Sequence, residues 1–422
     1  MSEPSKLLSH FGGIDRALST KSYRTYWTGQ VVMVQGFWIY KIASGSLMWD
    51  LTESSAWLGA LGSAYLLPIF FLGPFGGAVA DRYGYRRMAM AMGGCGAAIA
   101  LFTAIMTWFG FISPACLVFL TLIQGFLFAF EFPARQALFP NLVERKDIPA
   151  AVALNATTFH SSAFTGPLIG GVLLWVSGAG AGFAANAFCM TWMMIAIYFI
   201  PSPPNLSARL EEKKASGILN DLKDGLRYTH QHIDIRLLIL LTIVTSLFIR
   251  PYIDFLPGFA GDVFNNGKKG LTALTAASGI GALFFASFFA IRGRTKGLIS
   301  FMFIGQIGAA LSLTLFSFSD IFIFGLIAIL FVGGFLVSAS ICIQSLIQHS
   351  VDDNYRARVV AVNVSLAVGA PALSAIVIGW IAEVYGLPLA MGGTAALSLI
   401  FIAPIGLKLR KRRREIEAVK KF

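Results

Sequence analysis

Charged residues are scarce in this 422-residue chain. Asp, Glu, Lys and Arg make up 13% of it, hydrophobic residues make up 56%, and the mean hydropathy is +0.72. A soluble core cannot bury that much apolar surface, which excludes an ordinary soluble domain. At about twenty residues per span, the apolar runs predict an all-α membrane protein with twelve transmembrane helices. The runs cover residues 23–49, 56–80, 87–109, 114–140, 149–173, 180–200, 236–260, 270–291, 297–317, 320–348, 357–383 and 387–407.

The motifs of soluble enzymes and of metal sites are also missing. The chain has no Walker loop and no nucleotide-binding motif, and its cysteines lie dispersed in apolar runs without metal-ligand spacing. We therefore expect no enzymatic activity, no metal and no cofactor, and we expect the cysteines to be inert packing residues. Residues 1–22 lack the apolar core of a signal peptide, so the first span itself is expected to direct insertion. The four cysteines are Cys95, Cys116, Cys189 and Cys342.

Positive charge is abundant, since the net charge is +12, but it lies almost entirely on one side of the predicted spans. All but four of the 33 Lys and Arg residues fall in alternate loops and in the two tails, and the positive-inside rule assigns that side to the cytoplasm. This asymmetry predicts cytoplasmic termini and excludes a nucleic acid as the partner of the basic residues. The four exceptions are Lys41, Arg250, Lys268 and Lys269.

An internal repeat divides the chain into two related halves. A shift of 208 positions aligns residues of the first half with identical residues of the second. The aligned pairs include Gln136 with Gln344, Asn155 with Asn363, and Gly178 with Gly386. An even number of spans in each half predicts two parallel six-helix bundles related by a pseudo-symmetry axis along the membrane normal, with a solute site between them near the midplane.

The repeat and the polar breaks predict five segments. Residues 1–22 form a cytoplasmic N-terminal segment, 23–200 an N-terminal six-helix bundle, 201–235 a cytoplasmic linker, 236–407 a C-terminal six-helix bundle, and 408–422 a basic cytoplasmic tail. Within the linker, apolar positions in 217–230 indicate an amphipathic helix on the inner membrane surface, and a solvated linker helix is the alternative.

A short charged turn follows the second predicted span. Its residues have the spacing G-x-x-x-D-R-x-G-x-R-R, and the apolar runs on both sides place them at a membrane surface. An ordinary charged hairpin is one interpretation. The spacing also resembles the loop between helices 2 and 3 of the major facilitator superfamily of transporters. This chain departs from that pattern at Tyr85, where the superfamily usually has a basic residue. We expect the acid to couple the inner ends of the two bundles by accepting hydrogen bonds near Tyr355 and Arg356. The motif residues are Gly77, Asp81, Arg82, Gly84, Arg86 and Arg87.

Further motifs indicate a branch of that superfamily and a transport direction. Residues 132–143, 150–155 and 355–359 resemble the branch that contains enterobactin exporters and macrolide-efflux proteins. The sequence Gly166-Pro167-Leu-Ile-Gly170-Gly171 resembles the GPxxGG motif of its antiporter-type members and implies export, although close helix packing alone would also explain the glycines. Thr121 stands where many proton-coupled members carry arginine, so proton coupling is not expected at that position.

Ionisable residues within apolar spans are functional candidates because they are costly unless they are paired or hydrated. Arg250 and Asp254 are four residues apart, as are Glu131 and Arg135, so each pair is expected to lie on one helix face. Under the repeat, Lys41 falls within one position of Arg250. We expect Lys41, Arg250 and Asp254 to form a gate between the halves, in which Asp254 neutralises both cations when the outside is closed. Static ion pairs and snorkelling are the alternatives.

Several neutral residues complete the candidate set. His160 is predicted near the middle of a span, where it is either a packing residue or a proton relay. The glutamines are predicted to line the cavity, and they are Gln30, Gln35, Gln124 and Gln344.

Together these features favour a monomeric secondary transporter in a bacterial inner membrane. Its expected partners are the lipid bilayer, a small amphipathic drug-like or siderophore-like solute, and protons. Alternatives are a lysophospholipid flippase or solute importer of the same fold, and a membrane sensor or scaffold that transports nothing.

Overall fold

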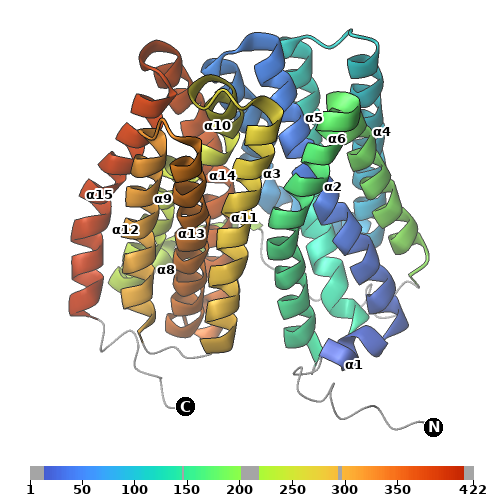
Figure 1. The fold of residues 1–422 in the computed structure, drawn as a ribbon. Coiled ribbons are helices and arrows are strands. Elements are labelled where there is room, and N and C mark those ends of the chain that lie inside the picture. Colours follow the sequence, from blue (N-terminus) through green and yellow to red (C-terminus); the bar gives the residue numbers. More distant parts are fainter. Residues whose placement is uncertain (1–13, 145–146, 201–217, 293–296, 413–422) are drawn as a thin grey trace.

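The computed structural model describes residues 14–144, 147–200, 218–292 and 297–412, and this part of the chain is helical without strands (Figure 1). The predicted tail 408–422 and the linker 201–235 therefore lie partly outside the described residues. The elements are α1 (Ile14–Ser19), α2 (Lys21–Thr52), α3 (Ser55–Tyr83), α4 (Tyr85–Trp108), α5 (Pro114–Leu138), η2 (Phe139–Leu142), α6 (Ile148–Tyr198), α8 (Ile218–Gln231), α9 (Ile233–Phe248), α10 (Tyr252–Gly258), η5 (Phe259–Val263), α11 (Gly267–Arg292), α12 (Leu298–Ser317), α13 (Phe322–Ser350), α14 (Asp353–Tyr385) and α15 (Leu387–Lys411).

The described helices account for the twelve predicted spans. Ten of them are long and apolar enough to cross a membrane, and Ile233–Val263 forms a further, interrupted span. α6 has 51 residues, or about 76 Å of helix at 1.5 Å per residue, which is more than twice the thickness of the hydrocarbon core. Its backbone breaks at Gly178, where φ is 74° and ψ is −175°, so α6 is two spans. The loop expected between residues 173 and 180 is therefore a break at one residue.

The sharp turns at Gly178 and Gly386 confirm the alignment of these two glycines by the internal repeat. Both residues have a positive φ, 74° and 86° respectively, and each joins the fifth span of its half to the sixth. Residues with a Cβ are strained in this conformation, whereas glycine adopts it freely. The same glycine turn with a positive φ therefore occurs at equivalent places in the two halves.

The seventh span is interrupted rather than continuous, so the prediction of one helix over 236–260 is wrong. α9 ends at Phe248, α10 begins at Tyr252, and the chain passes into the π-helical η5 at Phe259. The Arg250 backbone N–H donates to the Thr245 carbonyl, five residues back, at 3.0 Å. Pro251, which has no N–H to donate, follows directly. The interruption changes which way the side chains after Phe248 point.

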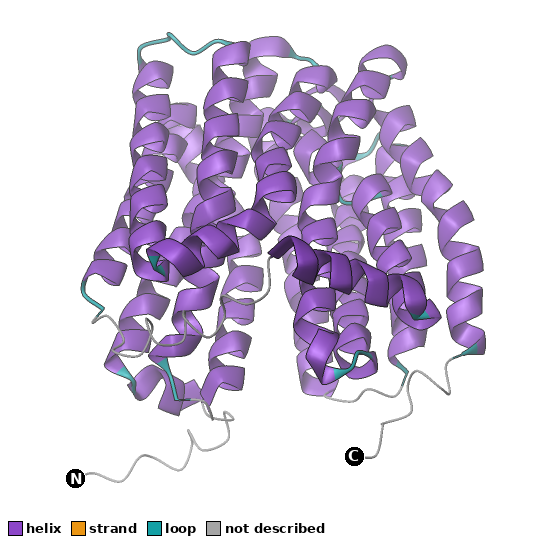
Figure 2. Cartoon of the chain, turned by 180° about the vertical axis from the view of Figure 1, so that it is seen from behind, coloured by secondary structure: helices purple, strands orange, loops and turns teal. Residues whose placement is uncertain are grey.

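Two groups of helices lie side by side, with α2–α6 in one and α9–α15 in the other (Figure 1). Arg412 pairs with Asp234 at 2.6 Å and Arg16 pairs with Asp147 at 3.0 Å, so α15 ends where α9 begins and α1 lies where α6 begins. We refer to this end of the molecule, where α2 also begins, as the basic end. Both views show the ribbons of the two groups meeting at the opposite end and diverging toward the basic end (Figures 1 and 2).

The amphipathic segment is helical over Ile218–Gln231, and the chain turns by 109° between it and the span that follows (Figure 2). The Tyr228 hydroxyl donates to Asp352 Oδ2 at 2.9 Å, and the rings of Tyr228 and Tyr355 stack with centroids 4.5 Å apart. Burial raises the pKa of Tyr228 above its ordinary value, so its hydroxyl stays protonated at neutral pH and keeps its role as a donor. This contact ties α8 to the beginning of α14.

Large apolar side chains cover the outside of the helix groups. Trp175, Trp380, Phe188 and Phe284 are among the many that are largely exposed. A soluble protein does not expose contiguous apolar surface on this scale, and a bilayer would cover it. Cys95 is also exposed, so the prediction that the four cysteines are packing residues is wrong for this one.

Candidate functional site

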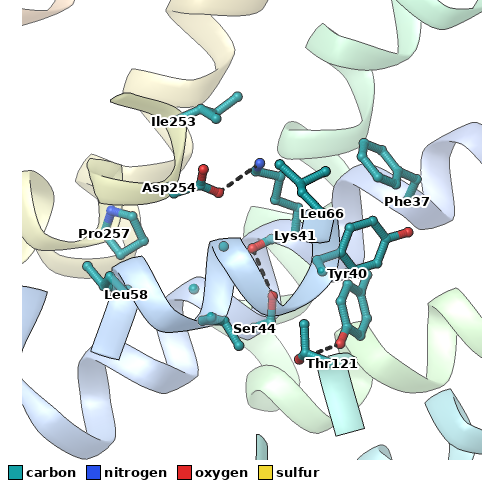
Figure 3. Close-up of a pocket in the computed structure, with 14 residues that line it drawn as sticks. Phe37, Tyr40, Lys41, Ser44, Leu58, Leu66, Thr121, Ile253, Asp254 and Pro257 are labelled. Carbon is teal, nitrogen blue, oxygen red and sulfur yellow. Dashed lines mark hydrogen bonds and ion pairs between the residues drawn. The ribbon is translucent and has the colours of Figure 1, made fainter. Parts of the chain in front are cut away.

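An ion pair joins the two helix groups near the middle of the molecule. Lys41 Nζ on α2 lies 2.9 Å from Asp254 Oδ1 on α10, and the two side chains are 25% and 8% exposed. Figure 3 shows the two side chains pointing toward each other, with a dashed line marking the ion pair. Two of the three predicted gate residues are thus in contact, although they are 213 positions apart in the sequence.

The cavity beside this pair is lined mainly by α2 and α3, with one wall from α10. Phe37, Tyr40 and Tyr65 form an aromatic wall, and the Tyr40 hydroxyl shares a hydrogen bond of 2.8 Å with Thr121 (Figure 3). Apolar walls with a few polar groups are typical of sites for organic ligands. The full lining comprises Phe37, Tyr40, Lys41, Ser44, Gly45, Leu58, Leu61, Gly62, Tyr65, Leu66, Thr121, Ile253, Asp254 and Pro257.

Two glycines that the sequence reasoning did not identify allow α10 to approach this closely. A Cβ on Gly62 would lie 2.7 Å from Asp254 Cγ, and a Cβ on Gly45 would lie 3.0 Å from Pro257 Cγ. Any larger residue at Gly62 would therefore displace the carboxylate that Lys41 contacts. The chain has 43 glycines, and nothing in their sequence context distinguishes these two.

The seam between the two groups, formed by α3 with α14 and by α6 with α11, is tightly packed from the opposite end to about mid-depth. Ser54 Oγ, at the beginning of α3, donates to Glu383 Oε2 on α14 at 2.9 Å, and Ser63 Oγ donates to the Ala372 carbonyl at 2.6 Å. On the other side of the seam, a Cβ on Gly279 of α11 would lie 2.6 Å from the Ala163 carbonyl oxygen of α6. The structure is therefore closed at the opposite end.

Substituting a seam glycine should force this closure apart. A Cβ on Gly59 would lie 2.3 Å from the Ala375 carbonyl oxygen, which is backbone and cannot move aside. We expect Gly59→Val to separate α3 from α14 and to increase the rate at which a thiol reagent labels a cysteine placed at buried Leu61, in a variant without native cysteines. Gly94→Val is the matched control, because a Cβ there meets nothing within 4 Å. Equal labelling of the two variants would contradict the tight seam.

Arg250 does not pair with Asp254, so that part of the predicted gate is wrong. Its Nη2 donates to Ser340 Oγ on α13 at 2.7 Å, while Asp254 faces Lys41. The four-residue spacing places side chains on one face only within a continuous helix. Here the break between α9 and α10 separates them.

Glu131 and Arg135 form a buried pair within the first helix group. Arg135 Nε lies 2.6 Å from Glu131 Oε1, and their side chains are 4% and 1% exposed. Arg135 also donates to Gln30, and its carbonyl accepts from the Tyr26 hydroxyl at 3.3 Å. Glu131 Oε2 is buried and has no hydrogen-bond partner. The predicted pairing is present, and it includes one of the predicted cavity glutamines.

The other predicted cavity glutamines connect helices of the same group. Gln35 Nε2 donates to Thr165 at 2.7 Å, Gln124 Nε2 donates to the Gly96 carbonyl at 3.2 Å, and Gln344 Oε1 accepts from Asn363 at 3.1 Å. None of them belongs to the lining of the cavity beside Lys41. His160 lies on α6, but its side chain is outside the described part of the structure.

The GPxxGG motif lies where α6 meets both α2 and α11. A Cβ on Gly166 would lie 2.5 Å from Trp38 Cβ, and one on Gly170 would lie 3.3 Å from Ile39 Cα. A Cβ on Gly171 would lie 2.1 Å from Thr272 Oγ1 in the other group. Pro167 lies inside the helix. The motif therefore supports close packing within a bundle and across the seam.

In the charged turn, Asp81 accepts a hydrogen bond from the Tyr85 hydroxyl. Gly84 has φ 91°, which explains the glycine at this position, and Arg86 donates to the Tyr198 carbonyl at 2.6 Å. The backbone N–H groups of Tyr355 and Arg356, expected to be unpaired donors for Asp81, donate to the Asp352 carbonyl at 2.9 and 3.0 Å. That part of the loop prediction is wrong. Of the other motif residues, Gly77 and Arg82 lie in α3 and Arg87 lies in α4.

Two six-helix bundles that meet at a charged seam define a membrane transporter of the major facilitator fold. A solved nucleoside transporter, NupG, has this fold with a TM-score of 0.71 at 16% identity, over 91% of this chain and 98% of that chain. The profile of the transmembrane secretion effector family (MFS_3) matches residues 16–422, so the chain belongs to that family.

Two curated relatives are similar in sequence. The uncharacterized MFS-type transporter YfiS of Bacillus subtilis is 25% identical over 404 residues, which is 93% of this chain and 95% of that protein. The staphyloferrin A transporter of Staphylococcus aureus is 26% identical over 165 residues, which is 39% of this chain and 42% of that protein.

Proposed function

We propose that this transporter exports an amphipathic organic solute from the cytoplasm in exchange for protons. The observation that carries the proposal is the Lys41–Asp254 pair, because it closes the seam between two bundles whose relative movement would expose a central site to each side in turn. A titratable carboxylate that holds the seam closed provides a direct link between proton binding and opening.

The sidedness follows from the charges. The positive-inside rule places the basic end in the cytoplasm, and it predicts that both termini lie there, in a bacterial inner membrane. On this assignment the end closed by α3 and α14 is the outer side, and the described conformation faces the cytoplasm.

Proton coupling would act on Asp254. The ion pair forms only with an ionised Asp254, so closing the outer side brings Lys41 to a carboxylate that has released its proton. Opening the outer side separates the pair and exposes Asp254 to the external medium, where it would take up the proton that it carries inward. One proton therefore enters the cell for each cycle that carries solute outward.

Several observations support an amphipathic, exported solute. The aromatic wall formed by Phe37, Tyr40 and Tyr65 suits an apolar ring system. The description of the family as secretion effectors and the GPxxGG resemblance at Gly166–Gly171 both favour export. The similarity to a staphyloferrin A transporter favours a siderophore-like solute, and the macrolide-efflux resemblance favours a drug-like one.

The test is uptake into inverted membrane vesicles with the interior made acidic, which corresponds to an acidic cell exterior. Labelled siderophores, macrolides and lysophospholipids should be compared, and we expect accumulation of one of the first two only when the pH gradient is present. Movement of lysophospholipid alone would instead identify a flippase, and uptake in the reverse direction would identify an importer. An absence of flux for every solute would favour a sensor or scaffold.

A further inference from the structure

Among the described residues, three cations lie well inside the membrane-spanning segments, and one of them differs from the other two. Lys41 contacts Asp254 at 2.9 Å, and Arg135 contacts Glu131 at 2.6 Å. Arg250 instead contacts the neutral hydroxyl of Ser340 at 2.7 Å, and no acid among the described residues lies within ion-pair distance of it. The site around Arg250 therefore carries an uncompensated positive charge.

This charge needs a partner that the described chain does not supply. An unpaired cation at this depth costs several kcal/mol, and such residues face a cavity or a substrate pathway rather than lipid. A guanidinium has five N–H donors in a planar fork, and the Ser340 hydroxyl takes only one of them. A planar carboxylate can accept two more in parallel, which is the geometry that arginine favours in recognition.

Arg250 lies between α9 and α10, at one end of a series of polar contacts within the second helix group. The segment that carries it continues into α10, whose Asp254 packs against Gly62 of the other bundle. Below Ser340 on α13, one turn nearer the basic end, Gln344 accepts from Asn363, which in turn accepts from Thr242 of α9 at 2.8 Å. Polar groups from three helices thus lead from the basic end toward Arg250.

The opposite bundle provides an aromatic cluster beside the Lys41–Asp254 pair. Phe37, Tyr65 and Phe128 lie with ring centroids 5.7 to 6.1 Å apart, and Tyr40 lies 5.9 Å from Tyr65. We propose, on the basis of the proposed transport function, that the solute is an amphipathic organic acid: Arg250 and Ser340 bind its carboxylate, and the aromatic cluster binds its apolar ring.

The test is equilibrium binding of a matched pair of fluorescent probes to the purified full-length protein in detergent. Dansylglycine carries an ionised carboxylate at neutral pH, and its methyl ester has nearly the same shape without the charge. We expect the wild type to bind the acid about 10- to 100-fold more tightly than the ester, since a hydrogen-bonded charge contributes about 1.5 to 3 kcal/mol. Arg250→Gln should abolish this preference and leave binding of the ester unchanged.

Further variants separate recognition from structure. Arg250→Lys should retain part of the preference, because it keeps the charge but not the fork, and Ser340→Ala should weaken acid binding several-fold. Lys268→Gln, at an exposed cation elsewhere, should leave the preference intact. Arg250→Gln should melt at or above the wild-type temperature, because it removes an unpaired cation rather than one half of a pair.

The inference is overturned if the wild type shows no saturable binding of dansylglycine, if it binds the ester equally well, or if Arg250→Gln keeps the preference. It fails separately from the proposed function. A preference for the acid in detergent would support the inference whatever the direction of flux. Export of neutral solutes by a protein that binds the acid and the ester equally well would contradict only this inference and not the proposed function.

Discussion

Asp254→Asn should reduce proton-driven transport by about tenfold or more while the protein still folds. Asparagine preserves the size of the side chain but cannot neutralise Lys41, which would remain a cation 25% exposed at the seam. Losing a partly buried partner of this kind costs about 2 kcal/mol, enough to shift an equilibrium about 30-fold, and the shift would favour the state open at the outer side. Flux in vesicles and thiol labelling of seam cysteines measure the two effects.

Matched variants make this result specific. Asp262→Asn changes an exposed acid in the same interrupted span and should leave flux unchanged. Exchanging the partners in Lys41→Asp/Asp254→Lys should restore closure of the seam, and with it the low labelling rate, even if flux stays low. Unaltered flux and labelling in Asp254→Asn would mean that the pair is only structural and that the gate lies elsewhere.

Glu131→Gln should destabilise the protein by about 3 to 5 kcal/mol, the largest stability effect that we expect from one substitution. The change leaves Arg135 as a buried cation that still contacts the Gln30 amide oxygen and the Phe132 ring but has lost its anionic partner. Thermal melting in detergent should detect it, and Glu131→Gln/Arg135→Gln should recover much of the loss, because it removes both charges together.

The control for this prediction is an exposed ion pair. Asp50 and Lys268 lie 3.2 Å apart with side chains more than 40% exposed, and Asp50→Asn should change stability by less than about 1 kcal/mol. If Glu131→Gln were as mild as this control, the prediction of a stabilising buried ion pair would be wrong.

Sequence periodicity predicted the helices well because membrane spans leave strong local signals. The turn at Gly84 and the Glu131–Arg135 pair depend on nearby residues, and the repeat that aligns Gly178 with Gly386 is visible by comparing the two halves of the sequence. A loop was expected between the fifth and sixth spans. The two spans are instead separated by Gly178 alone, since one glycine with a positive φ is enough to turn the chain.

Contacts between bundles were harder to predict. The repeat related Lys41 to Arg250, and the four-residue spacing added Asp254 to the predicted gate. Arg250 was nevertheless assigned the wrong partner because the break after Phe248 was not apparent. Pro251 signals an interruption but does not give its direction. Tyr85, identified only as a departure from the loop motif, bonds to the motif's own acid.

The glycines that bring α3 to α14 and α6 to α11 also govern how the protein leaves its closed state. Gly59 and Gly279 place one backbone directly on another, without flexible side chains between them. A radial gap of about 0.5 to 1 Å already removes about a quarter to a half of the dispersion attraction, so a slightly opened seam loses much of its contact energy before any new contact forms. Partly opened states of the seam are consequently sparsely populated. The molecule should therefore switch between two discrete conformations, closed and open, and the seam should not widen gradually.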